Sequence, residues 1–183
     1  MILSGDLSHV LITSARLTLR SFTAADSAES FAEVNERIAR YMSWNPPSPE
    51  EHEGIVQWHI ASMKAGGDLG LVLRLSTTNE FIGRASLEPA DGTLLETGIW
   101  IKEAAQGIGY GREAIAALTR WASETFHPSG FLWPVVDENT PSRKLAEALR
   151  GEIIGTHQRQ KPGDVARTLL LYRLPATTPE ISN

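Results

Sequence analysis

The sequence predicts a mixed α/β fold, in which one sheet of strands carries helices on its faces. Two observations lead to this class. Short apolar or alternating segments, typical of strands, are interspersed along the chain with segments of helical periodicity. In addition, the apolar run at 94–101, which is expected to be a buried strand, leads through a glycine-rich turn into a helical segment at 111–126.

The first part of the chain is expected to supply one strand and one helix. Residues 1–14 are expected to form a loose leader. Polar and apolar residues alternate from 16 to 20, which is the period of a half-buried strand. Thr23 precedes Asp26 by three positions, close to a capping box, and a helix is expected at 24–35.

A proline-rich run separates this helix from the next one. A helical or irregular arm at 37–45 is expected to end at the prolines that follow it, because proline cannot lie inside a helix. Pro49 and the acidic residues after it favour the start of a second helix, which is expected to end near Gly66 and Gly67.

Strands and helices alternate in the rest of the chain. Thr140 is expected to cap a short helix that begins with Pro141. A single domain is therefore expected at 15–174, followed by a disordered tail at 175–183. The remaining strands are expected at 69–75, 81–87, 94–101, 131–136, 152–160 and 165–174.

The turn at 106–112 (QGIGYGR) is the stretch where chemistry is expected. Glycine lets the backbone adopt positive φ and lets a ligand approach without a Cβ in the way. The free N–H groups at the start of the following helix favour an anion, and Arg112 adds a positive charge. These features indicate a phosphate or pyrophosphate cradle, and a tight turn without a ligand is the alternative.

Two common nucleotide-binding motifs do not fit this turn. A dinucleotide fingerprint that began at Gly107 would require glycine at the position of Arg112. A P-loop would require lysine followed by serine or threonine, and no such pair follows the glycines. A nucleotide-binding domain is therefore disfavoured.

Composition excludes several classes of function. The length of 183 residues favours one domain with a sizeable core. The absence of cysteine excludes disulfides, thiolate catalysis and cysteine-ligated metals, and it favours a cytoplasmic location. The net charge of −5 disfavours nucleic acid as a partner. No membrane span and no metal site are expected, because no apolar run is long enough and the five histidines lack ligand spacing.

Five stretches together resemble the GNAT superfamily of N-acetyltransferases, and within it the RimJ/RimL-like branch of ribosomal-protein N-terminal acetyltransferases. The turn matches the coenzyme A motif Gln-x-x-Gly-x-Gly of this superfamily. The resemblance covers about 14–174, and the order of strands and helices is also that of the GNAT fold. The other stretches are 14–20 (SARLTLR), 41–44 (YMSW), 96–101 (ETGIWI) and 138–142 (ENTPS).

The chain departs from the branch after Leu149, where Arg150 and Gly151 stand in place of the usual Gly-Phe. The missing aromatic residue concerns the packing around the far end of the cofactor. The resemblance otherwise implies a GNAT-like acyl-CoA N-acyltransferase fold, with its central strands splayed around acetyl-CoA.

The resemblance implies that acetyl-CoA lies in a gap between the strands that end at Ile101 and Val136. The turn would bind the pyrophosphate through its backbone N–H groups, and a backbone N–H group of the central strand would stabilise the oxyanion. The expected cofactor-binding residues are Ile99, Trp100, Ile101, Gln106, Gly107, Ile108, Gly109, Tyr110, Gly111, Arg112, Asn139 and Ser142.

Two catalytic roles are predicted. Glu96 is the first candidate for the general base, because a carboxylate in an apolar strand is costly unless it is paired or faces a cleft. Glu138 and His157 are the alternatives for this role. Ser142 is expected to donate a proton to the leaving thiolate, whereas simple helix capping is the alternative for Ser142 and Asn139.

Three aromatic side chains are expected to bind the amine acceptor, because this branch places its first two helices over the substrate. They are Tyr41, Trp44 and Trp58, and a role in the hydrophobic core is the alternative for each.

The sequence therefore predicts an acetyl-CoA-dependent N-acetyltransferase that acts by direct attack of a primary amine through a tetrahedral intermediate. A noncatalytic acyl-CoA-binding or regulatory module on the same fold is the alternative. Protein N-termini, an amino acid, a polyamine and an aminoglycoside-like antibiotic all remain open as acceptors, because the fold does not determine the acceptor. A homodimer is compatible with the sequence.

Overall fold

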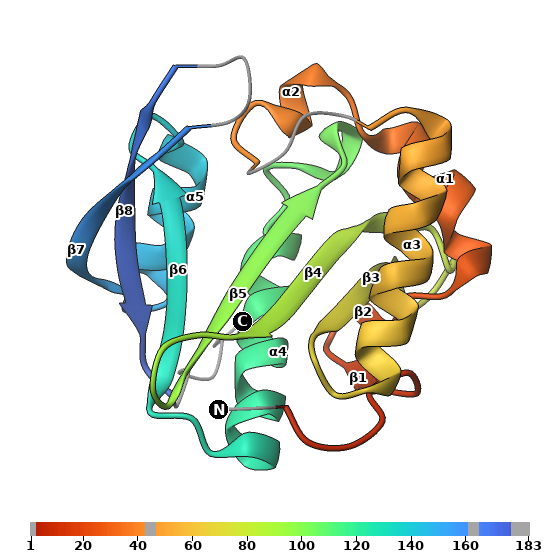
Figure 1. The fold of residues 1–183 in the computed structure, drawn as a ribbon, viewed down its shortest axis with the longest axis horizontal. Helices are drawn as coiled ribbons and strands as arrows, with labels where there is room; N and C mark the ends of the chain where they lie inside the picture. The colour runs from red at the N-terminus through yellow and green to blue at the C-terminus, as the bar shows by residue number, and fades with distance from the viewer. Residues whose placement is uncertain (1–2, 43–46, 161–164, 177–183) are drawn as a thin grey trace.

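The computed structural model describes residues 3–42, 47–160 and 165–176. Its centre is one sheet of eight strands in the order β1-β2-β3-β4-β5-β6-β8-β7 (Figure 1). Neighbouring strands are antiparallel except β5 and β6, which run parallel. The strands are β1 (Leu11–Thr13), β2 (Leu17–Ser21), β3 (Leu69–Leu75), β4 (Phe81–Pro89), β5 (Leu94–Ile101), β6 (Gly130–Val136), β7 (Glu152–Arg159) and β8 (Arg167–Leu174).

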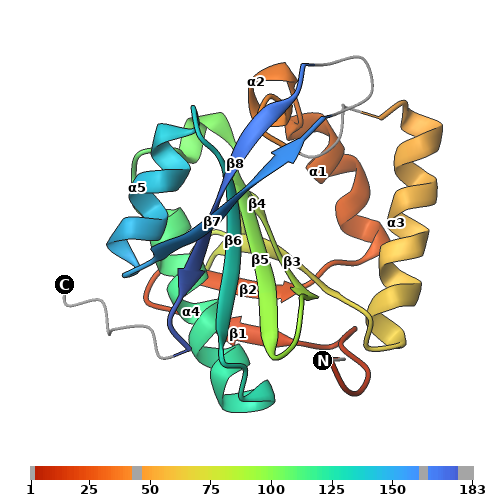
Figure 2. The ribbon, with the colours of Figure 1, turned by 60° about the vertical axis from the view of Figure 1, so that its left-hand side comes forward.

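Helices cover both faces of this sheet, which confirms the predicted α/β class. Figure 2 shows α1 and α3 on one side of the sheet and α4 and α5 on the other. The helices are η1 (Ala24–Asp26), α1 (Ser27–Glu33), α2 (Glu36–Ala39), α3 (Pro49–Lys64), η2 (Glu103–Ala105), α4 (Tyr110–Phe126) and α5 (Thr140–Ala148).

Helix α4 buries one stripe of small and aliphatic side chains, as its periodicity predicts. Ile115, Leu118 and Ala122 are fully buried and belong to the core, whereas Phe126 at the end of the stripe is only half-buried and stacks edge-on against Trp121. Helix α4 packs against β5, and the short connection through η2 places the start of the helix near the end of β5.

The N-terminal segment is ordered over its described part, contrary to the loose leader predicted for 1–14. Leu3 and Leu7 are buried in the core, and the Leu7 N–H group donates to the carbonyl of Met63 at 3.0 Å. Strand β1 pairs with β2 and adds Ile12 to the core. The prediction was wrong because the buried side chains of Leu3, Leu7 and Ile12 follow no helical or strand period that the sequence would reveal. Residues 177–183 of the predicted tail lie outside the described part.

Side-chain caps fix the starts of the helices on the two sides of the sheet. Ser48 and Glu51 form a capping box ahead of α3, with Pro49 in its first turn, as expected. Helix α5 is capped by Asn139, whose Oδ1 accepts from the Ser142 N–H group at 3.3 Å. The prediction that Thr140 is the cap was therefore off by one residue, because the amide of Asn139 already satisfies the first turn.

Strands β5 and β6 pair only at their beginnings and then separate. Their ladder joins Leu94, Leu95 and Glu96 to Gly130, Phe131 and Leu132, and no pairing follows within these described strands. In Figure 1 the two strands lie together at the bottom and diverge towards the top. The carboxyl ends of both strands therefore border an opening in the sheet, where ligands of α/β proteins commonly bind.

The ladder stops just before Pro134. The hydrogen bond from Asp137 N–H to the Thr168 carbonyl shows that odd-numbered residues of β6 direct their backbone groups to β8. The even-numbered residues therefore face β5. The next bond after Leu132 would require an N–H group at Pro134 to donate to Thr97, and proline has none.

Candidate functional site

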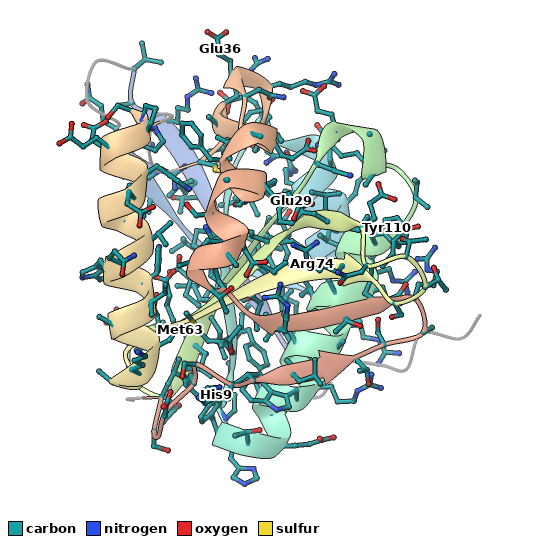
Figure 3. All side chains as sticks on the ribbon, turned by 90° about the vertical axis from the view of Figure 1, so that its right-hand side faces the viewer. His9, Glu29, Glu36, Met63, Arg74 and Tyr110 are labelled. Atoms are coloured by element: carbon teal, nitrogen blue, oxygen red, sulfur yellow. The ribbon has the colours of Figure 1, made fainter. Side chains whose placement is uncertain are left out.

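The glycine-rich turn at 106–112 follows β5 and η2 and leads into α4. Gly107 and Gly109 adopt φ values of 77° and 90°, which L-residues with a Cβ rarely adopt. Gly109 is the N-cap of α4, and no side chain caps the helix there. In Figure 3, Tyr110 lies at the edge of the molecule where the chain turns from β1 to β2.

This turn fits a pyrophosphate group. A Cβ at Gly107 would have no atom within 4 Å, so the space beside the turn is open. The first-turn N–H groups of Tyr110, Gly111 and Arg112 have no side-chain cap, and they carry the positive end of the helix dipole. An anion of the size of a pyrophosphate can therefore accept several hydrogen bonds from the backbone.

The side chain of Gln106 braces the turn rather than facing the open space. Its amide Nε2 donates to the carbonyl of Ile101 at 2.8 Å. This bond links the residue after η2 to the last residue of β5, and it therefore fixes the backbone that leads into Gly107. Gly111, at the other end of the turn, approaches Leu145 of α5, with 3.6 Å between a Cβ at Gly111 and the leucine Cδ2.

The three residues of β5 that are predicted to bind the cofactor do not all direct their backbone groups to the same side. The Lys102 N–H group donates to Ile82, so even-numbered residues of β5, including Trp100, direct their backbone groups to β4. Ile99 and Ile101 therefore direct theirs into the opening. The Ile101 carbonyl accepts the hydrogen bond from Gln106. The N–H groups of Ile99 and Ile101 point away from β4.

Asn139 and Ser142 lie on the other side of the opening, at the start of α5. Asn139 caps the helix, as the alternative interpretation held. The hydroxyl of Ser142 accepts a hydrogen bond from Trp133 Nε1 at 3.0 Å. Because the indole is a donor only, the hydroxyl proton of Ser142 remains available for another acceptor. Trp133 was not among the predicted residues, since an aromatic residue in a strand usually signals only the core.

Glu96 stands directly opposite Glu88 in the antiparallel pair of β4 and β5. The two side chains therefore share one face of the sheet. Burial, and after it the charge of Glu88, raises the pKa of Glu96, while the charge of Arg159 lowers it. Burial and the charge of Asp68 likewise raise the pKa of Glu88. Sequence reasoning missed Glu88 because it placed this residue in a loop, whereas β4 continues to Pro89.

The face that carries Glu96 is the one covered by α3. His59 of α3 contacts Asp68 at 2.8 Å between Nδ1 and Oδ2, and both residues act on the pKa of Glu88. Arg159, at the end of β7, donates to the carbonyl of Tyr41 at 3.1 Å. Tyr41 thus lies near the charges that act on Glu96.

The other predicted residues are less enclosed. Trp58 is 62% exposed on α3, so it does not belong to the core. Glu138 and His157, the alternative bases, are both exposed. Trp44 lies outside the described residues.

Two further properties concern the described residues as a whole. None of their helices is long and apolar enough to cross a membrane. Within the same ranges, no group of three or more His, Cys, Asp or Glu side chains is arranged to hold a metal ion.

Comparison with known proteins gives a family and a set of similar structures. The profile described as "Acetyltransferase (GNAT) domain" matches residues 16–152. No curated protein matches the sequence significantly. An acetyltransferase of the GNAT family from Bacillus anthracis superposes with a TM-score of 0.80 at 19% identity, covering 91% of this chain and 99% of its own.

Two of the similar structures contain coenzyme A. Mycobacterium smegmatis RimJ in complex with CoA-disulfide has a TM-score of 0.79 at 18% identity, covering 94% of this chain and 90% of that one. RimL, a ribosomal L7/L12 α-N-protein acetyltransferase in complex with coenzyme A, has a TM-score of 0.80 at 20% identity, covering 92% and 99%. These likenesses confirm the predicted fold.

Proposed function

Because the chain belongs to the GNAT acetyltransferase family, whose cofactor is acetyl-CoA, we propose that it acetylates a primary amine. The observation that carries this proposal is the opening between β5 and β6. It has an uncapped helix start at one end, and Glu96, a carboxyl group of raised pKa, precedes it on β5. The helix start would hold the cofactor and the carboxyl group would accept a proton from the amine, and acetyl transfer requires both.

The turn and the edge of β5 would hold the cofactor. The N–H groups of Tyr110, Gly111 and Arg112 would bind the pyrophosphate, and the free backbone groups of Ile99 would pair with the pantetheine as a strand does. Acetyl-CoA supplies an acetyl thioester, whose carbonyl oxygen gains negative charge during the attack. The N–H group of Ile99 or Ile101 is then the oxyanion donor, because Trp100 directs its own to β4.

Glu96 would accept the proton of the arriving ammonium group. An amine can attack only after it has lost this proton, and a carboxylate with a raised pKa is a stronger base than an ordinary one. Glu96 is preferred to Glu138 and His157, since both alternatives are exposed, whereas Glu96 is partly buried in the central strand.

Ser142 would donate a proton to the leaving sulfur. Its oxygen is fixed by the hydrogen bond from Trp133 at 3.0 Å, which leaves its own proton free to move. Asn139 would act mainly by holding the first turn of α5, and so the position of Ser142.

A protein N-terminus is the first acceptor to test, with small amines second. RimJ and RimL are among the similar structures, although at about 20% identity they establish the fold alone. The five sequence stretches shared with that branch are the further support. Tyr41 and Trp58, with Trp44 between them in the chain, would contact the acceptor from the arm and from α3.

Calorimetric titration with acetyl-CoA is the decisive first experiment, with NADH and ATP as controls. We expect micromolar binding of acetyl-CoA and no binding of either control. An amine panel read by release of free thiol then compares N-terminal peptides, amino acids, polyamines and aminoglycosides. If acetyl-CoA does not bind, the proposal fails. If it binds tightly but no amine releases thiol, the noncatalytic module is the better description.

A further inference from the structure

Arg16, at the turn between β1 and β2, contacts the cofactor turn at three points. Its Nη1 donates to the Ile108 carbonyl at 3.3 Å. Its guanidinium carbon lies 4.6 Å from the centroid of the Tyr110 ring. Its Nη2 lies 3.6 Å from the position of a Cβ on Gly109. A residue distant in sequence therefore lies against the segment that binds the pyrophosphate.

The same arginine neutralises a carboxylate under the turn. Glu113 is buried in the first turn of α4 and accepts from the backbone N–H and the Nε of Arg16, each at 2.7 Å, and from Ser14 Oγ at 2.7 Å. Burial would raise the pKa of Glu113, but these hydrogen bonds and the charge of Arg16 lower it, so the group is ionised. A negative charge suits a helix start but repels a phosphate bound at that start.

We propose that Arg16 is a further cofactor-binding residue, which offsets the charge of Glu113 and presents Nη2 to the pyrophosphate. The inference rests on the proposed use of this turn for acetyl-CoA. Two observations distinguish it from a purely structural ion pair. The Arg16 side chain is 45% exposed, and among the hydrogen bonds of the described residues none uses Nη2. The guanidinium therefore has donors left for an anion, in the planar arrangement that phosphate prefers.

The two roles can be separated by a double-mutant cycle on acetyl-CoA binding, measured by calorimetry. We expect Arg16→Ala to weaken binding about 10- to 100-fold, because it removes a charged donor and uncovers the Glu113 carboxylate. In the Glu113→Gln background, Arg16→Ala should raise the dissociation constant of acetyl-CoA by a several-fold smaller factor, since no carboxylate is left without its counter-charge. Arg16→Lys, which keeps the charge without the planar group, should fall between Arg16→Ala and the unchanged protein.

Arg120→Ala is the matched control. Arg120 is exposed on α4, roughly 15 Å along the helix axis from its start, so its loss changes the net charge alone. Thermal unfolding of each variant verifies that it folds. Equal dissociation constants for Arg16→Ala and Arg120→Ala would overturn the inference, as would an Arg16→Ala effect that is no smaller beside Glu113→Gln. If the unchanged protein fails to bind acetyl-CoA, the proposed function fails instead.

Discussion

Two side chains act on Glu96 in opposite directions. Glu88 faces it across the ladder of β4 and β5 and raises its pKa, whereas Arg159 of β7 lowers it. The proposed general base is therefore influenced by one residue on the neighbouring strand β4 and by one on β7, at the far edge of the sheet. Both influences are electrostatic, so removing either charge has a definite sign.

Glu88→Gln should move the acidic limb of the pH–rate profile to lower pH. Without the facing negative charge, the ionised form of Glu96 is less disfavoured and its pKa falls. Since the base must be deprotonated, activity then persists to lower pH. The measurement is kcat/KM against pH with the best acceptor of the amine panel.

Arg159→Gln should shift the same limb to higher pH, which makes the pair of variants an internal test. Glu124→Gln, on the exposed side of α4, is the control for a change in net charge and should leave the limb unmoved. Shifts of the same sign in both variants, or none in either, would argue that Glu96 is not the base.

Ser142→Ala should lower kcat about 100-fold with little change in KM for acetyl-CoA. The reason is that the hydroxyl is expected to act on the leaving sulfur rather than to bind the cofactor. Release of free thiol measures the rate. Thr140→Ala, which removes an exposed hydroxyl from the same helix, is the control. Unchanged turnover in Ser142→Ala would leave helix capping as the role of this segment.

At the scale of elements, the proposed cofactor site requires β5 and β6 to remain apart. Pro134 lacks the N–H group that would extend their ladder, and its neighbours in β6 stay paired to β8 on the other side. The opening thus begins at the one position of β6 that lacks a donor.

Pro134→Val should weaken acetyl-CoA binding up to about tenfold. The new N–H group can donate to Thr97, and one net hydrogen bond of about 0.5–1.5 kcal/mol would favour the closed strands over the open ones. Calorimetric titration measures the dissociation constant. Pro89→Val is the control, because Pro89 faces Leu95, where the sheet is already closed. Binding as tight as in the unchanged protein would show that other contacts keep the strands apart.

At the scale of the whole molecule, one charged network ties helix α1 to the sheet. Asp26 is buried and accepts from both terminal nitrogens of Arg20, at 2.7 and 2.6 Å, and from Arg74 at 3.1 Å. Arg74 also donates to Glu29 at 2.5 Å, and Figure 3 shows these two side chains pointing towards each other. Burial would raise the pKa of Asp26, but the hydrogen bonds from Arg20, Thr23 and Arg74 outweigh it and hold the pKa far below the usual range.

Asp26 should therefore make the protein sensitive to acid. A carboxylate with a depressed pKa stabilises the fold fully above its unfolded pKa of about 4, and this contribution is lost as the pH falls towards the folded value. Asp26→Asn should cost about 3–5 kcal/mol near neutral pH, because it leaves buried Arg74 short of a partner. Its stability should then fall less steeply between pH 5 and pH 2.

Urea unfolding at a series of pH values tests this prediction. Asp91→Asn, in the exposed loop before β5, is the control and should follow the unchanged protein. If Asp26→Asn loses stability in acid as steeply as the unchanged protein, the acid sensitivity comes from other carboxyl groups.

The sequence by itself determined the local features of this protein. Hydrophobic periodicity located α3, α4 and the strands from β2 onward, because each pattern extends over several turns or residue pairs. The glycines predicted a turn with positive φ, which Gly107 and Gly109 adopt, because this conformation is a property of single residues. The same stretches carried the resemblance to the family.

Only the tertiary structure decided which distant residues meet. It brought Glu88 opposite Glu96 through the register of β4 and β5, and Arg16 against Glu113 through the packing of β2 beside α4. It also buries Leu3 and Leu7 in the core and places the Trp133 indole within hydrogen-bond distance of Ser142. These contacts depend on the alignment of strands and helices, which burial of the whole core fixes and no local pattern encodes.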